Sequence, residues 1–302
     1  MNPLYRKISV ALINTSLPEP YNSYGDHWKD GFEDAGCDVT VFSYSQIPWI
    51  PPRFDLYFFV EIRYKFTDIP WYLNPRVLYS WDSHVTGPET FIEAAKHYDK
   101  VLLASKIDVQ TLKDLGVSNA VWIPEACNPR IHKNLCRMED RSIQLGFIGN
   151  LNNTIVRNGH TKNDFIDHLK NGPYKLYHKT LAFGSDYTIA QNLIRVMFDR
   201  TIAHNIGTRI FESCAAGCVP LWSDTGIDNG IHELLIENAH YVPYNDTIED
   251  LDRVLEELYR DTNRMKDITA SAECHVLNNH TYAHRVLKVL DTVGVKPLSI
   301  SC

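Results

Sequence analysis

The sequence contains no uninterrupted apolar run that approaches the roughly 18 residues of a membrane-spanning helix. It also lacks a signal-peptide pattern, because residues 1–7 lead directly into a strand-like segment. We therefore expect a protein that has no membrane span and resides in the cytoplasm. Low-complexity segments are missing too, and a content of 44% hydrophobic residues is typical of a globular chain rather than a disordered one.

Several chemical signatures are absent as well. The seven cysteines are scattered without a CxxC pair, so we expect buried reduced thiols and no zinc site. No GxGxxG motif follows the first predicted strand, which disfavours an NAD-dependent enzyme. No DxD motif directly follows a predicted strand. The net formal charge of -7 argues against a broad nucleic-acid footprint.

The first part of the chain alternates short apolar runs with helix-like segments. We predict strands at residues 8–13, 38–42, 55–60, 76–80, 100–104 and 120–123, and helices at residues 24–35, 88–97 and 106–115. Strands that alternate with helices indicate right-handed βαβ units and a parallel sheet. The fold class is therefore α/β, with ligands expected beyond the carboxyl ends of the strands.

The same pattern restarts after a polar stretch at residues 128–142. We predict strands at residues 144–148, 219–222 and 240–243, and helices at residues 161–170, 186–197, 228–237, 248–261, 263–278 and 281–293. A length of 302 residues suits two domains, each with its own core. We expect a first domain at residues 1–135, a second at 136–278, and a C-terminal helix within 279–302 that packs back across the domains.

The most informative segment is residues 205–221, which predicts a glycine turn, a short helix, a second glycine and an apolar strand. Gly207 frees the backbone to approach a ligand, and Thr208 is the predicted N-cap. Gly217 suits the left-handed position after the last turn. The free N–H groups of such a helix start form an anion site. Glu212 lies one turn further in, where its carboxylate can accept both hydroxyl protons of a ribose. The alternative interpretation is a surface helix with a solvated glutamate.

Further motifs occur around this segment in a distinctive order. They lie at residues 98–101, 112–116, 123–129, 145–149 and 280–285. Together with Arg209-Ile-Phe-Glu212, Gly217 and Pro220, this order resembles GT-B glycosyltransferases of the CgeB-like, group 1 type. The resemblance extends over residues 75–290. It implies two Rossmann-like domains that face each other across a cleft, with the donor on the C-terminal domain.

The resemblance also implies a reaction. A glycosyltransferase of this type moves a sugar from a nucleotide-diphosphate sugar, here with a UDP-sugar favoured, to an acceptor hydroxyl. No metal and no other cofactor is implied, because the helix dipole and cations serve the diphosphate in GT-B enzymes. The acceptor class is left open among glycan, lipid, protein and modified DNA, and the stereochemical outcome is left open too.

The donor-binding candidates follow from the same resemblance. Residues Gly207, Thr208 and Arg209 form the turn expected at the diphosphate, with the strand end Gly149-Asn150 beside it. Arg157 and Lys162 follow that strand and can reach a phosphate, although a solvated surface position is the common alternative.

Related retaining enzymes carry two glutamates eight positions apart. Glu212 matches the later position, whereas the earlier one falls on His204, so the sequence departs from the pattern there. His204 is a candidate for a hydrogen bond to a sugar hydroxyl, with Asn205 as an alternative.

Catalytic candidates on the first domain follow its fourth predicted strand. Asp82 and His84 are suited to act as general bases, because each can take a proton from an acceptor hydroxyl. Trp81 can stack on a sugar ring or a base. The alternative is that Asp82 only caps a helix and that the tryptophan is buried.

Two other functions compete with this interpretation. The departure at His204 favours a non-catalytic protein that binds a nucleotide or sugar. A DNA glycosyltransferase acting on hydroxymethylated bases, as in phages, would need a basic groove. Its candidate residues are Arg63, Lys65, Arg130, Lys133 and Arg137.

Overall fold

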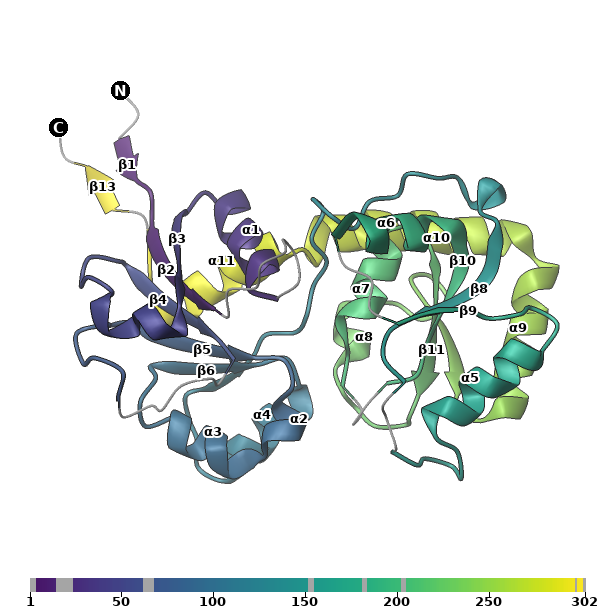
Figure 1. Cartoon of the computed structure of the whole chain (residues 1–302), viewed down its shortest axis with the longest axis horizontal. Helices are drawn as coiled ribbons and strands as arrows, with labels where there is room; N and C mark the ends of the chain where they lie inside the picture. The colour runs from purple at the N-terminus through teal and green to yellow at the C-terminus, as the bar shows by residue number, and fades with distance from the viewer. Residues whose placement is uncertain are drawn as a thin grey trace. The chain divides into compact units, whose positions relative to one another are not determined.

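The computed structural model describes residues 4–14, 24–61, 68–151, 155–180, 184–201, 205–296 and 298–300, apart from the side chains of residues 4, 5, 84 and 298–300. The chain forms two compact units (Figure 1). The N-terminal unit comprises residues 1–125 and 282–302, and the C-terminal unit comprises residues 126–281. The expected domain bounds differ from these. The chain passes from the N-terminal to the C-terminal unit after Glu125, and the last helix belongs to the N-terminal unit.

The N-terminal unit is built on a six-stranded parallel sheet in the order β3-β2-β4-β5-β6-β7. Its strands are β2 (Ser9–Asn14), β3 (Asp38–Ser43), β4 (Leu56–Val60), β5 (Arg76–Ser80), β6 (Lys100–Leu103) and β7 (Ala120–Trp122). Its helices are α1 (Tyr24–Asp34), η1 (Tyr44–Trp49), α2 (Ser83–Thr86), α3 (Pro88–Ala94), α4 (Lys106–Asp114) and α11 (Tyr282–Val293). Every residue of β4 is buried, as expected for an apolar central strand covered on both faces.

The last helix completes the N-terminal unit. Helix α11 packs against α1 at a close approach, because a Cβ atom added to Gly31 would lie 2.7 Å from the Cβ of Tyr282. Arg285 of α11 donates to the main-chain oxygens of Pro124 and Glu125 at 2.9 Å each. The strands β1 (Leu4–Arg6) and β13 (Leu298–Ile300) then pair antiparallel.

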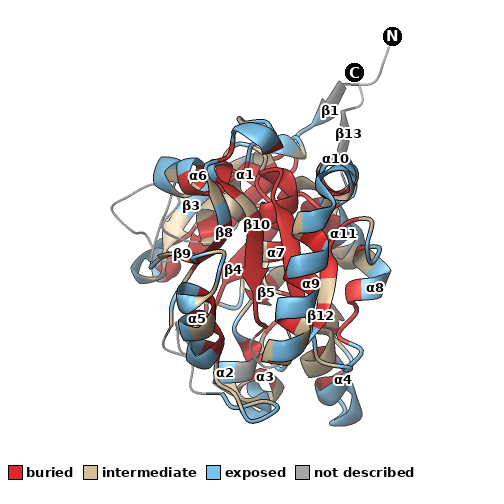
Figure 2. Cartoon of the chain, turned by 90° about the vertical axis from the view of Figure 1, so that its right-hand side faces the viewer, coloured by how far each residue is buried: buried red, intermediate tan, exposed pale blue. Residues whose placement is uncertain are grey.

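The C-terminal unit is built on a five-stranded parallel sheet in the order β12-β11-β10-β8-β9. Its strands are β8 (Ile143–Ile148), β9 (Tyr177–Lys179), β10 (Ile194–Asp199), β11 (Val219–Asp224) and β12 (Val242–Asn245). Its helices are η3 (Met138–Asp140), α5 (Lys162–Asn171), α6 (Gly184–Leu193), α7 (Thr208–Ala215), α8 (Ile231–Leu234), α9 (Ile248–Arg260) and α10 (Thr262–Asn279). The central strands of both sheets lie in buried cores, as β4 and β10 show in Figure 2.

Two predicted helices differ from the structure. The predicted helix 186–197 was wrong over its last four residues, 194–197, because α6 ends at Leu193 and β10 begins at Ile194 with no residue between them. A Gly or Pro would have marked this boundary, and the sequence has neither there. The predicted helix 228–237 shrinks to the four residues of α8, because Gly230 is left-handed and Leu235 is extended.

Each sheet has one point where the strand order reverses. In the C-terminal unit, β9 and β10 lie on opposite sides of β8, so the reversal lies between β8 and β10. In the N-terminal unit, it lies between β2 and β4. Open α/β sheets bind ligands at this position, beyond the carboxyl ends of the strands. The residues after β8, β10, β2 and β4 are therefore the first to consider.

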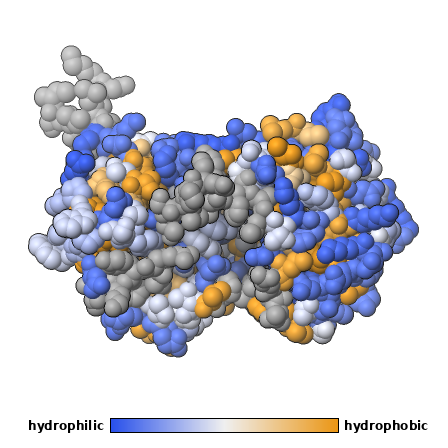
Figure 3. Space-filling model, viewed as in Figure 1, coloured by the Kyte–Doolittle hydropathy of each residue, from blue (hydrophilic) through white to orange (hydrophobic). Residues whose placement is uncertain are grey.

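Among the described residues, no helix combines the length and the apolar character needed to cross a bilayer. On the face shown in Figure 3, hydrophilic residues predominate and apolar side chains form separate patches. Ile189 and Leu193 of α6 are 58% and 39% exposed. Scattered apolar exposure of this size is ordinary on a protein surface.

Candidate functional site

Helix α7 begins at the carboxyl edge of the C-terminal sheet. The predicted N-cap was wrong by one residue: Gly207 occupies that position, and Thr208 is the first helical residue. The N-cap Gly207 offers no side-chain capping hydrogen bond, and among the described residues a Cβ atom added to it would meet nothing within 4 Å. The first N–H groups of a helix that starts in this way suit an anion. At the other end, Gly217 has the predicted left-handed backbone, with φ of 71°.

Arg209 joins the two strands at the reversal point. Its Nε donates to the main-chain oxygen of Ile148 at 3.0 Å, and its Nη1 forms an ion pair with Asp199 at the end of β10. Its guanidinium also lies over the ring of Phe147, 4.8 Å from the centroid. Gly149 allows the guanidinium its close approach to the main chain, since a Cβ atom there would lie 2.6 Å from Nη2 of Arg209. Arg209 is thus held within the sheet edge and contributes positive charge there.

Lys162 is a buried cation beside this arginine. It is the first residue of α5, whose start is fixed by reciprocal hydrogen bonds between Thr161 and Asp164. The lysine is 2% exposed, and its Nζ lies 5.3 Å from the centroid of Phe147. Burial, followed by the nearby charge of Arg209, lowers the pKa of Lys162 to about 8. Across the described part of the chain, no hydrogen bond or ion pair neutralises this ammonium group.

Two further arginines share one carboxylate at the same edge. Asp246, just after β12, accepts from Nε and Nη2 of Arg200 at 2.8 and 3.0 Å. It also pairs with Nε of Arg157 at 3.1 Å, and Arg157 donates to Oγ1 of Thr201 at 3.0 Å. Arg157, Arg200, Arg209 and Lys162 lie close enough for the arginines to act on the pKa of Lys162. Four cations thus face two paired carboxylates, Asp199 and Asp246, at this edge.

Glu212 is buried one turn into α7, so the alternative of a solvated glutamate is wrong. Its side chain is 10% exposed. The hydroxyl of Tyr187, on α6, donates to Oε2 of Glu212. Nε2 of His132 lies 3.5 Å from Oε1, on the other side of the carboxylate. Burial lowers the pKa of His132 to about 3, so its imidazole is neutral.

The predicted donor-binding residues also include Asn150, Asn205 and His204. Asn150 follows Gly149 and is exposed, and Asn205 is half-buried two residues before the N-cap of α7. His204 lies outside the described residues. Of the basic candidates for DNA, Arg130, Lys133 and Arg137 are exposed on the segment before β8, and Arg63 and Lys65 lie outside the described residues.

The corresponding edge of the N-terminal sheet carries a second group of polar residues. Glu61 follows β4, is 8% exposed and has a left-handed backbone, with φ of 71°. Its Oε1 accepts from the main-chain nitrogen of Trp81 at 2.7 Å, and its Oε2 accepts from Oγ of Ser80 at 3.1 Å. Burial raises the pKa of Glu61. The rings of Trp81 and Tyr24 lie 4.3 Å apart.

The two predicted catalytic residues, Asp82 and His84, come just after Trp81 in the sequence. Asp82 is exposed at the N-cap position of α2, but its side chain makes no capping hydrogen bond. His84 is on α2, and its side chain lies outside the description. A left-handed non-glycine residue at a strand end often marks a functional position. Glu61 therefore joins Asp82 as a candidate on this edge.

A family comparison identifies the chain. A family model described as glycosyl transferase-like matches residues 138–291, which is just over half of the sequence. The chain belongs to the glycosyl transferase-like family. The match contains β8, α5, α6, α7 and β10, so the described edge of the C-terminal unit lies within the family region. The predicted resemblance to glycosyltransferases is confirmed, and the protein is an enzyme rather than a non-catalytic binding protein.

Similar solved structures cover nearly the whole glycosyltransferase chain. Anabaena HepE in complex with UDP and glucose is 12% identical, with a TM-score of 0.63 over 96% of this chain and 100% of that chain. A glycosyltransferase from Rickettsia africae is 12% identical, with a TM-score of 0.59 over 96% and 98%. Sucrose-phosphate synthase from Thermosynechococcus elongatus is 10% identical, with a TM-score of 0.63 over 94% and 98%.

These likenesses show the fold. The predicted α/β architecture of the GT-B type is confirmed by the two parallel sheets and by the solved structures. No curated protein gives a significant match to the chain. Within the described ranges, no group of three or more His, Cys, Asp or Glu side chains is arranged to hold a metal ion.

Sequence reasoning missed several residues of these two candidate edges. Tyr187 and His132 lie 25 and 80 residues before Glu212, and no spacing rule links them to it. Asp199 and Arg200 were missed because β10 was predicted as helix. A weak signal existed for Glu61, since it directly follows an apolar run at a predicted strand end.

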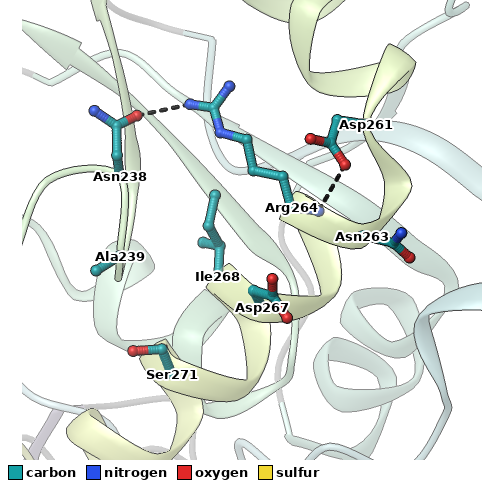
Figure 4. Close-up of a pocket in the computed structure, with 8 residues that line it drawn as sticks. All are labelled: Asn238, Ala239, Asp261, Asn263, Arg264, Asp267, Ile268 and Ser271. Carbon is teal, nitrogen blue, oxygen red and sulfur yellow. Dashed lines mark hydrogen bonds between the residues drawn. The ribbon is translucent and has the colours of Figure 1, made fainter.

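A surface pocket elsewhere in the C-terminal unit does not compete with this edge. It is lined by Asn238, Ala239, Asp261, Asn263, Arg264, Asp267, Ile268 and Ser271 (Figure 4). Arg264 donates to Oδ1 of Asn238 at 2.7 Å, and Asp261 caps α10 by accepting from the main-chain nitrogen of Arg264 at 2.9 Å. Asn238 and Ala239 precede β12, so this side of the pocket lies near the amino end of that strand, and the other lining residues lie between residues 261 and 271 at the start of α10. Its polar groups serve the start of a helix.

Proposed function

We propose that the C-terminal unit of this glycosyltransferase binds a nucleotide-diphosphate sugar at the β8/β10 edge and donates its sugar to an acceptor hydroxyl. The single observation that carries the proposal is Lys162, a buried ammonium with no carboxylate partner among the described residues. An unneutralised buried cation is costly, so its retention points to an anionic ligand. The Anabaena structures with UDP and glucose or with UDP-glucose favour a UDP-sugar.

The diphosphate is proposed to lie between Lys162 and the uncapped start of α7. Main-chain N–H groups after Gly207 and the buried ammonium would then meet the charge that develops on the leaving diphosphate. Preorganised donors of this kind stabilise a transition state without reorganisation. Arg209, Arg157 and Arg200 raise the positive potential while staying paired within the protein. This arrangement supplies the electrostatic role without a metal ion.

Glu212 is proposed to hold the ribose, and the loop before α7 to hold the transferred sugar. The glutamate lies one turn from the helix start, which matches the separation between a diphosphate and its ribose. His204 and Asn205 stand three and two residues before Gly207 in the sequence and are therefore proposed to contact sugar hydroxyls. Gly149 and Asn150 directly follow β8, the other strand of the β8/β10 edge.

The acceptor is proposed to bind the N-terminal unit at the edge after β4 and β5. In the transfer, the acceptor oxygen bonds to the anomeric carbon, and the bond from that carbon to the diphosphate oxygen breaks with its electron pair. The acceptor proton passes to a base, for which Asp82, His84 and Glu61 are the candidates. The rings of Trp81 and Tyr24 are suited to stack against a sugar acceptor.

Isothermal titration with UDP and GDP tests the donor assignment. We expect Glu212→Ala to weaken nucleoside diphosphate binding by about tenfold to a hundredfold, since a hydrogen bond to a charged group contributes roughly 1.5–3 kcal/mol. Glu249→Ala, which removes an exposed carboxylate at the start of α9, is the matched control and should leave binding unchanged. Equal affinity of Glu212→Ala and wild type would remove the ribose assignment.

A substitution at the start of α7 tests the diphosphate assignment separately. Gly207 has φ of -80°, which any residue can adopt, and open space beside its Cβ position. Gly207→Asp should cap the helix and raise its stability by a few tenths of a kcal/mol. It should also weaken UDP binding at least about tenfold, because a carboxylate would occupy the anion position. Unchanged UDP affinity alongside a normal thermal melt would argue that the diphosphate binds elsewhere.

A further inference from the structure

We propose that a small pocket between α2, α3 and α4 of the N-terminal unit binds one uncharged sugar ring of the acceptor, so that the acceptor is a carbohydrate. The inference rests on the proposed function, because it takes the edge after β5 as the acceptor side. It goes further by naming the chemical class of the acceptor and the side chains that select it.

The pocket lies wholly within the N-terminal unit, where Figure 1 shows α2, α3 and α4 next to one another. Its volume is about 190 Å³. Pockets for drug-sized ligands measure roughly 300–1,000 Å³, so this one suits a single small ring. Its lining includes Ser83, which directly follows the candidate base Asp82 in the sequence. A ring in the pocket would therefore lie beside the edge proposed for the acceptor.

Apolar side chains form one part of the lining. They are Pro88 and Phe91 of α3 and Leu112 of α4. Phe91 and Leu112 are buried and belong to the core of the unit, so their positions are fixed by packing. A rigid apolar wall of this kind suits the C–H face of a sugar ring.

The polar side chains of the lining all present hydrogen-bond acceptors. The hydroxyl of Ser83 donates its hydrogen to Oδ2 of Asp108, and the hydroxyl of Thr111 donates to the main-chain oxygen of Ile107 at 3.0 Å. A hydroxyl oxygen whose hydrogen is used in this way can still accept, and an ionised carboxylate only accepts. Oδ1 of Asp108 has no hydrogen-bond partner among the described residues. The ligand must therefore supply the hydrogens.

The Asp108 carboxylate is turned away from its own helix. Asp108 is the third residue of α4, and its main-chain nitrogen donates to the N-cap Ser105 at 3.2 Å. An acidic side chain at this position can bond back to the main chain before the helix. Asp164 does so in α5, where it accepts from the main-chain nitrogen of Thr161 at 2.6 Å. Asp108 accepts from Ser83 instead, which holds its carboxylate beside the pocket.

Several hydrogen-bond acceptors around an apolar wall favour a sugar ring over other acceptors. No cation is among the described residues that line the pocket, so a phosphate or another anion would meet the Asp108 carboxylate without compensation. An amine would pair with the carboxylate as well. The proposed reaction consumes a hydroxyl, however, which a sugar ring supplies and an amine does not.

The experiment is a saturation-transfer NMR titration of the full chain with the methyl glycosides of glucose, galactose, mannose and N-acetylglucosamine, with and without saturating UDP. We expect wild type to bind at least one of the four. Asp108→Asn should weaken that binding about tenfold, because a hydrogen bond to a charged acceptor is stronger than one to a neutral amide. Asp114→Asn makes the same change at an exposed position at the end of α4 and should leave glycoside binding as in wild type.

A purely structural role for the contact between Ser83 and Asp108 is the competing explanation. Asparagine keeps an oxygen that can accept from Ser83, so the link between α2 and α4 stays in place in Asp108→Asn. UDP affinity should be unchanged in this variant, because Asp108 belongs to the N-terminal unit. A loss of glycoside affinity with normal UDP affinity is the readout that a structural role would not produce.

The outcomes separate the inference from the proposed function. Binding of UDP but of none of the four glycosides by wild type would overturn the inference and leave the proposed function standing. Glycoside binding that Asp108→Asn retains in full would also overturn the inference, and so would binding of lysine methyl ester in place of every glycoside. Absence of binding to UDP and GDP would overturn the proposed function and the acceptor role, while the glycoside titration still decides whether the pocket holds a sugar.

A second variant keeps the test decisive if Asp108→Asn unfolds. Thr111→Val removes another acceptor oxygen at an exposed helix position and should weaken the same glycoside about threefold. Circular dichroism melts establish that each variant is folded before titration. Undiminished glycoside binding by a folded Thr111→Val variant would contradict the assignment of this pocket.

Discussion

Replacing Lys162 with methionine is expected to stabilise the unliganded enzyme at neutral pH and to remove most of its affinity for a nucleoside diphosphate. The lysine is 2% exposed, and its pKa falls from 10.5 to about 8 through burial first and Arg209 second. At about 1.36 kcal/mol per pKa unit, the buried charge costs about 3 kcal/mol. Methionine fills similar volume over Phe147 without a charge. A gain in the free energy of unfolding of up to about 3 kcal/mol follows.

The gain should depend on pH in a defined direction. Below about pH 8 both the folded and the unfolded chain carry the Lys162 proton, so wild type bears the full cost. Between about pH 8 and 10.5 the unfolded chain binds more protons than the folded one, so wild-type stability rises with pH relative to the variant. Urea unfolding should therefore give a smaller difference in the free energy of unfolding between wild type and Lys162→Met at pH 10 than at pH 7.

The effect of Lys162→Met on UDP binding is a separate part of this prediction and has its own control variant. Lys162→Met should weaken UDP binding by about tenfold to a hundredfold, since a charge-assisted contact is lost. Binding by wild type near pH 8 should also take up a proton, because an anion raises the pKa of the lysine. Lys170→Met, at an exposed position of the same helix, should change neither property. A destabilised Lys162→Met variant that binds UDP normally would contradict the assignment.

Asp246→Asn is expected to have the largest effect on stability. Asp246 and Arg200 have side chains that are each 2% exposed, and two hydrogen bonds join them. Removing one partner leaves Arg200 as a buried charge without its carboxylate, which costs roughly 3–5 kcal/mol. The same change releases Arg157, so the positive edge of the site should lose its order. Urea and thermal unfolding measure the loss.

A surface pair provides the comparison for this variant. Asp252 pairs with His168 at 2.8 Å and is 50% exposed on its side chain. Asp252→Asn should change the free energy of unfolding by less than about 1 kcal/mol. If Asp246→Asn proves as mild as Asp252→Asn, the carboxylate does not neutralise the two arginines in the way the contacts indicate.

Much of the architecture could be predicted because the signals are local. Apolar runs such as residues 55–60 become buried central strands, and Gly217 ends α7 in a left-handed conformation. The prediction of an anion site at the start of α7 also uses only residues that are near in sequence. Even the misplaced N-cap, Gly207 rather than Thr208, moves the helix start by one residue only.

The remainder depends on contacts between distant segments. Strand β10 was hidden because Leu193 and Ile194 join a helix to a strand without a breaking residue. In the sequence, the position of Lys162 at a helix start predicts a surface cation. Only its packing against Phe147 in the structure shows that it is buried. Glu61 owes its buried carboxylate to Trp81 and Ser80, 20 and 19 residues away. No local pattern encodes such pairings.

The return of α11 to α1 has a consequence for synthesis on the ribosome. The C-terminal unit is one continuous stretch inserted into the N-terminal unit, and its two ends meet where Cys127 bonds to His280 through the main chain at 3.1 Å. Domains generally fold as units when their last element emerges from the ribosome. Residues 126–281 can therefore finish folding before residues 282–293 have been synthesised. The unit that is translated first is therefore completed last, and its sheet must wait for the final helix with α1 uncovered.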